Sequence, residues 1–364
     1  MVLPDSMNRN HLISIIIVAV VVIAAAAVGI SQLNNNEEDG DKTIVDSRNR
    51  TVTVPGNIDS VICLSSCSLE LVSYFDSVKK VAAIDKNDKI VGTKTYTQVH
   101  KDLFSSLPVV DSSNAESIIE LSPSIVISST IDVAALDQMQ TTFGIPVFAI
   151  NADLEFGSET WFTQIESLGK LFSEESRAKE IVKGVKDIIS DITSKKVSGI
   201  SGYTCGMMFY GAGSFLKTSG DWLPFDYTGV ANVMNRSTSG VGGQPYNTEI
   251  EQILSKNFDY VFIDGSNYEN VLKEMKGYID STTLGEKKAI QNGDVYKVLV
   301  YKIWGTQWDA QLINCLYVAS IVGDYGQNFE DKADQVLKVL YGSNVKFTYS
   351  DMANAQGGCK KLSI

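Results

Sequence analysis

The chain has 364 residues, of which 44% are apolar and 20% are charged, a composition typical of a globular protein rather than a disordered one. This length is sufficient for a membrane anchor and two lobes of ordinary size. The net charge of −12, without any cluster of lysines and arginines, argues against nucleic-acid binding, because contacts to phosphates require positive charge.

The first predicted element is a transmembrane helix, Leu12 to Ile30, which is interrupted only by Ser14 and Gly29. At about 1.5 Å per residue it would be roughly 28 Å long, close to the ~30 Å hydrocarbon core of a bilayer. Arg9 precedes it and several acidic residues follow it, so the positive-inside rule places the body outside the cell membrane. We expect an uncleaved anchor and tether over residues 1–42; a cleaved signal peptide is the alternative, and both export the body.

After the tether, short apolar runs alternate with longer amphipathic stretches, which predicts α/β layers with a largely parallel sheet. A hairpin is predicted first, from Thr43–Val45 and Thr51–Val54 around a polar turn. Further strands are predicted at Ser60–Leu64, Lys80–Ile84, Ile125–Ser128, Pro146–Ile150, Gly206–Tyr210, Tyr260–Asp264 and Val295–Val300.

One long helix is predicted over residues 173–196, midway along the body. Ser173 is its expected cap, and its apolar positions draw a single stripe with steps of three and one residues. A helix of about 22 residues spans roughly 33 Å, longer than an ordinary crossover. We interpret it as a strut that joins two lobes, 43–172 and 197–364; an ordinary surface helix is the alternative.

An internal echo supports two lobes of similar construction. Residues 113–127 align without gaps on residues 248–262, and the alignment places Glu116 opposite Glu251. Each segment is predicted to begin with a capping box, Ser113 with Glu116 and Thr248 with Glu251, and to continue with a short helix, a turn and a buried strand. The echo indicates a duplicated architecture.

At this point residues 43–345 resemble, in order, the iron-siderophore and vitamin B12 family of periplasmic binding proteins. The segments that carry the resemblance are Thr51–Pro55, Ser60–Glu70, Lys80–Asp85, Glu116–Ile127, Ser219–Asn235 and Glu251–Ile263. Two motifs depart from the family: the turn Ser65–Ser68 lacks a proline, and Asn257–Asp259 has phenylalanine where the family has proline. The resemblance implies an α/β fold of two Rossmann-like lobes bridged by a single long helix, preceded here by the transmembrane segment.

The resemblance also implies a function. The chain would be the substrate-binding protein of an ABC importer, capturing an iron complex, with cobalamin or haem as alternatives. It would act as a monomer, without a cofactor of its own, and deliver its ligand to a permease and its ATPase. Glu70 and Glu251 would dock on permease arginines. A solvated surface acid is the alternative for Glu70, and a helix cap is the alternative for Glu251.

The ligand is expected between the lobes, at the ends of the sheets, where large aromatic side chains would suit a chelate or a macrocycle. Lys94, Lys217 and Lys302 are further possible contacts for an anionic ligand. An ordinary place in the core is the alternative for each aromatic residue. The candidates for ligand binding are Ser65, Ser66, Tyr96, Tyr210, Trp222, Tyr246, Trp304 and Trp308.

Motifs for catalysis are missing from the sequence. His11 and His100 are the only histidines, which argues against a zinc site and against histidine-based catalysis. The spacing of Cys63 and Cys67 permits a disulfide between them but does not require one. No phosphate-binding glycine loop or hydrolase motif occurs, so we expect a binding protein rather than an enzyme. Two interpretations compete with this one. The first is an exported enzyme that uses only carboxylates, and the second is an anchored sensor or adhesin.

Overall fold

The computed structural model describes residues 40–88, 94–207, 213–235, 245–302, 305–323, 325 and 328–364. The predicted transmembrane segment lies outside these residues, and no helix in the described part has the length and apolarity needed to cross a membrane. Thr43–Val54 and Ile58–Ile364 form one structural unit, which is the exported body predicted from the sequence.

The first half of the body contains a five-stranded parallel sheet. Its spatial order is β5 (Val109–Val110), β4 (Val81–Asp85), β3 (Val61–Leu64), β6 (Ile125–Ser128) and β7 (Val147–Ala149). Side chains alternate along each strand, so Val61 and Cys63 pack into one core while Ile62 and Leu64 pack into another on the opposite face. Burial on both faces explains why these strands are continuous apolar runs.

The second half contains another five-stranded sheet, in which only the last strand is antiparallel. Its order is β10 (Ala231–Asn232), β8 (Ser201–Cys205), β12 (Tyr260–Ile263), β13 (Val295–Lys297) and β14 (Lys360–Lys361). The spatial order of four of these strands, β10-β8-β12-β13, matches the order β4-β3-β6-β7 in the first sheet, with each strand corresponding to the one in the same place. Within this repeat, α5 (Ala115–Glu120) leads into β6 as α10 (Ile250–Leu254) leads into β12. The topology therefore agrees with the internal echo in the sequence.

Two short sheets complete the β structure. The predicted hairpin is present as β1 (Lys42–Val45) and β2 (Thr51–Val54), and β9 (Lys217–Thr218) pairs antiparallel with β11 (Tyr246–Asn247). The strand predicted at 206–210 is wrong at its start, because β8 ends at Cys205 and Gly206 has φ +82°; its residues 208–210 lie outside the described residues. The actual strand was missed because serine and glycine begin it; Gly202 is required there, since a Cβ would lie 2.6 Å from the Phe225 ring.

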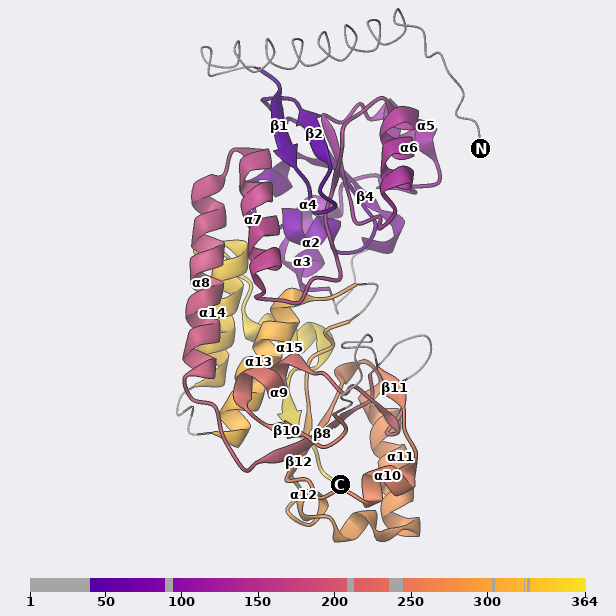
Figure 1. Cartoon of the computed structure of the whole chain (residues 1–364), viewed down its shortest axis with the longest axis vertical. Helices are drawn as coiled ribbons and strands as arrows, with labels where there is room; N and C mark the ends of the chain where they lie inside the picture. Colours follow the sequence, from indigo (N-terminus) through magenta and orange to yellow (C-terminus); the bar gives the residue numbers. More distant parts are fainter. Residues whose placement is uncertain are drawn as a thin grey trace, which may run out of the picture. The chain divides into compact units, whose positions relative to one another are not determined.

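The predicted long helix is α8 (Glu175–Thr193), which connects the two sheets along the chain. Its apolar stripe is buried against α7 (Glu159–Phe172) and α14 (Phe329–Tyr341), and the three helices lie side by side in Figure 1. Gly184 permits close packing, since a Cβ there would lie 2.7 Å from Val339. Arg177 donates to the carbonyls of Val339 and Leu340, both at 2.8 Å, and to that of Tyr74 at 2.9 Å.

Three predicted helix caps are wrong. Ser173 ends α7 with φ 58° instead of beginning α8. The N-cap of α5 is Asn114, whose side chain accepts from the Ser117 backbone, rather than Ser113. The N-cap of α10 is Glu249, without a side-chain cap, so Glu251 is not part of a capping box. A capping box does occur at α15, between Thr348 and Asp351.

The remaining helices cover the sheets and fill the space near the bridging helix. They are α2 (Ser68–Val72), α3 (Thr95–Val99), α4 (Lys101–Phe104), α6 (Val133–Phe143), α9 (Leu223–Thr228), α11 (Tyr268–Ser281), α12 (Lys288–Gln291), α13 (Trp308–Val322) and α15 (Tyr349–Gln356). Helix α13 is apolar on almost every side because it packs against α8, α9 and α14.

Candidate functional site

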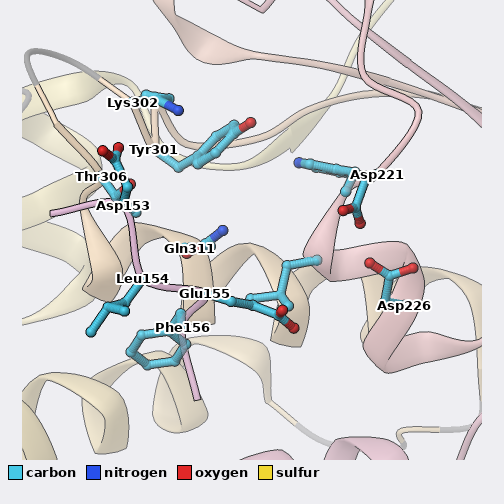
Figure 2. A pocket seen from close by; sticks show the side chains of 12 residues that line it. Asp153, Leu154, Glu155, Phe156, Asp221, Asp226, Tyr301, Lys302, Thr306 and Gln311 are labelled. Carbon is cyan, nitrogen blue, oxygen red and sulfur yellow. The ribbon is translucent and has the colours of Figure 1, made fainter. Parts of the chain in front are cut away.

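A pocket of about 270 Å³ is lined by three segments that are distant in the sequence (Figure 2). The first, residues 153–156, follows β7 of the first sheet. The second, residues 221–226, enters α9. The third runs from Tyr301, after β13 of the second sheet, to Gln311 in the first turns of α13. Loops at the ends of parallel strands are where α/β folds usually hold ligands.

Aromatic side chains give the pocket a rigid apolar wall. Phe156, Trp222 and Tyr301 all line it and are almost completely buried. The Trp222 ring is fixed by Phe225, whose ring centroid is 4.7 Å away, and by Phe262 at 5.8 Å. These side chains are already immobile, so they would lose little conformational entropy when a ligand contacts them.

Carboxylates dominate the polar lining of the pocket. Asp153, Glu155, Asp221 and Asp226 contribute four acids, against one ammonium from Lys302. Burial raises the pKa of Asp226 to about 7, with further contributions from Asp221 and Glu155. The ionisable side chains that line the pocket are therefore mostly acidic.

Of the residues predicted to contact ligand, the structure brings Trp222 and Lys302 into this pocket. Ser65 and Ser66 form the half-buried turn after β3, where the Ser65 backbone donates to Asp85 at 3.3 Å. Tyr210 and Trp304 lie outside the described residues.

The other three aromatic candidates lie away from the pocket lining. The buried hydroxyl of Tyr96 donates to Asp88, which also pairs with the buried Lys94 at 3.1 Å. Tyr246 donates to the Met234 carbonyl at 2.6 Å. Trp308 is fully buried at the start of α13. Tyr96 and Trp308 lie in the core, and Tyr246 is half-buried.

The expected surface position of Glu70 is wrong. Its side chain is 0% exposed, and Oε1 accepts from the Tyr74 hydroxyl at 2.7 Å and the Trp308 backbone at 2.9 Å. Burial raises the pKa of Glu70 well above its usual range, and Asp309 raises it further. The side of α2 opposite its apolar residues faces α13 rather than solvent, so Glu70 cannot meet a partner's arginine in this conformation.

Glu251, by contrast, is exposed in the first turn of α10. Glu116, its counterpart in the internal echo, is exposed in the first turn of α5. These two helices occupy equivalent places before β6 and β12. The pair of accessible carboxylates related by the duplication is therefore Glu116 and Glu251.

Sequence reasoning missed most of the pocket. Asp153 and Glu155 follow the strand predicted at 146–150, and Tyr301 follows the strand predicted at 295–300, so a survey of every loop after a strand would have included them. Asp221 and Asp226 flank the predicted Trp222. No local pattern shows that these three segments converge, because that depends on how the two sheets are placed by α8 and α13.

The turn carrying Ser66 is held against the segment that precedes α13. Cys67 Sγ lies 3.4 Å from the Thr306 carbonyl, and a Cβ on Gly305 would lie 2.5 Å from that sulfur and 2.9 Å from Ser66 Cβ. Gly305 also has φ +133°, which side-chain-bearing residues rarely adopt. All five cysteines are free thiols, Cys63 and Cys67 included.

We expect Gly305→Ala to destabilise the protein by about 1–3 kcal/mol, because the new methyl group is both strained and overpacked. The measurement is urea-induced unfolding, with Gly277→Ala as the control, since Gly277 has open space around it. A Gly305→Ala protein as stable as the wild type would show that this contact is not tight in solution.

Residues 63–298 match the periplasmic binding protein family, and the chain belongs to that family. As the resemblance predicted, it shares the fold of class III binding proteins, the substrate-binding components of ABC transporters. No group of three or more His, Cys, Asp and Glu side chains in the described ranges is arranged to hold a bare metal ion.

Named relatives extend the likeness over most of the chain. The molybdate-binding protein MolA of Haemophilus influenzae is 21% identical over 341 residues, 85% of this chain and 92% of that protein. Its molybdate-bound structure gives a TM-score of 0.62 at 17% identity, covering 85% of this chain and 99% of that one. A periplasmic solute-binding protein from Veillonella parvula gives 0.68 at 16% identity, covering 87% and 97%. At such identities the structural likeness shows the fold alone.

Proposed function

We propose that this chain captures an iron complex in the pocket beside Trp222 and delivers it to the permease and ATPase of an ABC importer. The observation that carries the proposal is the pocket itself, in which buried aromatic side chains from segments following both sheets face a shared polar lining. Immobile aromatic rings beside several charged groups suit a metal chelate, which has both apolar and polar parts. Haem or a corrinoid is the second candidate for the same wall.

Docking on the permease is proposed for Glu116 and Glu251. Both are exposed acids in the first turns of equivalent helices, and neither forms an ion pair within the described residues. Two separated carboxylates that meet two arginines would fix the orientation of the loaded protein by charge-assisted hydrogen bonds. The sequence predicts this role for Glu70 and Glu251. We assign it to Glu116 instead of Glu70, because Glu70 is buried.

The N-terminal apolar segment is proposed to keep the body at the outer surface of the cell membrane, where a binding protein meets its ligand before the permease does. The protein would work as a monomer without a cofactor of its own. A sensor or adhesin would have the same anchor and fold, but it would not require a permease that accepts the ligand.

Uptake of radioactive iron tests this proposal. A strain that lacks the gene is supplied with iron-55 complexes of hydroxamate and catecholate type, with haem and with labelled cobalamin. We expect loss of uptake of one ligand and its restoration by the wild-type gene. Unimpaired uptake of all of them would contradict an importer for metal complexes and would favour the sensor or adhesin.

A further inference from the structure

Two buried carboxylic acids lie where the first half of the chain meets α13. Glu70 on α2 and Asp309 on α13 are both 0% exposed, and neither forms an ion pair within the described part of the chain. Asp309 directly follows Trp308, whose backbone N–H donates to Glu70 at 2.9 Å. Two carboxylates in adjacent positions of one buried network cannot both ionise without a large cost, so the pair is expected to retain a proton.

The hydrogen bonds of the two acids indicate where this proton is held. Asp309 accepts from the Tyr341 hydroxyl at 2.6 Å and from the backbone of the next residue, so both of its oxygens have donors. Glu70 Oε1 accepts from the Tyr74 hydroxyl at 2.7 Å and from a backbone N–H, whereas Glu70 Oε2 is buried without a partner among the described residues. A buried oxygen without a donor is costly on an anion, so the proton is expected on Glu70.

The described basic groups around the two acids have other partners. Lys94 pairs with Asp88 at 3.1 Å, and Arg177 donates to three backbone carbonyls. The His100 ring packs on that of Tyr341, with centroids 6.1 Å apart, and burial lowers the pKa of His100, which disfavours its charged form. A second negative charge would therefore lack a counter-ion. The other titratable groups that surround the two acids are acidic, and burial raises their pKa values: Cys67, Tyr74, Asp88, Tyr96 and Tyr341.

The two acids are attached to one wall of the pocket. The described residues between Tyr301 and Gln311 form that wall, and Asp309 lies within the same stretch of chain. This stretch is held to the turn and helix that follow β3: a backbone N–H next to Asp309 donates to Glu70, and the Thr306 carbonyl accepts from the Cys67 thiol at 3.4 Å. Repulsion between two ionised acids would therefore act directly on the attachment of the pocket wall.

We propose that Glu70 and Asp309 share one proton and form a pH-sensitive latch, which holds this wall of the pocket against α2 while the proton is bound and releases it when both acids are ionised. A ligand in the pocket would then dissociate more readily as pH rises. The latch follows from the two buried acids alone, whereas its effect on a ligand rests on the proposed function.

The direction of the pH effect follows from the difference between the closed and open latch. In the closed latch, burial raises the pKa of Glu70 and Asp309 raises it further; burial also raises the pKa of Asp309. A Glu70 side chain that opening exposes to water would have a pKa of about 4.3, so closing takes up a proton. Above about pH 4.3, the open fraction should rise by up to about tenfold per pH unit, until the pKa of the closed latch is reached.

Hydrogen–deuterium exchange, followed by mass spectrometry, tests the latch without any ligand. The wild type is compared with Glu70→Gln at each pH, so that the intrinsic pH dependence of exchange cancels. In peptides from α2 and the first turns of α13, the wild type should exchange faster than the variant by up to about tenfold more per pH unit above about pH 4.3. The rise should be smaller in α11, which packs in the second core. A ratio independent of pH, or an equal rise in α11, would overturn the inference, since the latter means that Glu70 affects global unfolding only.

Two further measurements examine the shared proton itself. Asp309→Asn removes the like charge and should make the rise in exchange smaller, whereas Glu330→Gln, an exposed position on α14, should behave as the wild type. An unchanged rise in Asp309→Asn would contradict a shared proton. At about pH 6, where an exposed glutamate is ionised, the infrared spectrum of the wild type should contain the carbonyl band of a protonated acid that Glu70→Gln lacks. Identical spectra in that region would overturn the inference. Neither measurement depends on the identity of the ligand, so a failure of the iron-complex proposal would leave both results interpretable.

Discussion

Replacing Glu116 and Glu251 together by alanine is expected to reduce uptake of the ligand at least tenfold while leaving its affinity for the purified protein unchanged. Both side chains are exposed in the first turns of α5 and α10, away from the pocket lining, so their removal should affect only the encounter with the permease. The measurements are iron-55 uptake in complemented cells and ligand titration in vitro.

Two further exposed glutamates provide the control. Glu166 on α7 and Glu330 on α14 lie in the helical layer beside α8, and their double alanine variant should transport normally. The Glu70→Gln variant should also take up ligand normally, because a buried residue should not influence docking; this tests the choice of Glu116 over Glu70. Normal uptake by the Glu116/Glu251 variant would show that these acids do not dock the protein.

Replacing Glu70 by alanine is expected to cost about 2–4 kcal/mol of stability. The change leaves the Tyr74 hydroxyl and the Trp308 backbone N–H without their acceptor in a fully buried site. Glu70→Gln keeps an acceptor oxygen and should cost less. Urea-induced unfolding measures both, and an alanine variant with wild-type stability would contradict the role assigned to this contact between α2 and α13.

The same residue should make stability depend on pH. Burial, together with Asp309, raises the pKa of Glu70 in the folded protein above its value in the unfolded chain. The folded state therefore binds the Glu70 proton more tightly than the unfolded chain does. The contribution of this proton to the free energy of unfolding is complete below the ordinary glutamate pKa of about 4.3. It is lost as pH rises toward the pKa of Glu70 in the folded protein. The wild type should lose stability relative to Glu70→Gln over that rise; a gain would contradict the burial.

The fold was largely predictable because its strands are distinctive. Runs such as Ile125–Ser128 are buried on both faces and stand out from the amphipathic segments around them, and the stripe on α8 follows from its spacing. β8 was not predictable from apolar content, since Ser201 and Gly202 begin it and its packing is set by Phe225.

The site was less predictable for two physical reasons. Trp222 was found because an aromatic residue near a strand is a reasonable guess, whereas its neighbours Asp221 and Asp226 are ordinary surface acids until the fold places Glu155 beside them. Glu70 was misplaced because helix periodicity tells which residues share a face but not whether another helix covers the opposite face.

Tryptophan-fluorescence titration of the purified chain against ferric chelates, haem and cyanocobalamin tests the central claim most directly. Of the four tryptophans, Trp222 lines the pocket, Trp161 and Trp308 are buried outside its lining, and Trp304 lies outside the described residues, so a ligand seated beside Trp222 should quench the wild type saturably. Trp222→Phe should lose most of that quenching while retaining measurable affinity for the same ligand by calorimetry. Quenching of equal amplitude in Trp222→Phe would place the ligand outside this pocket and contradict the account.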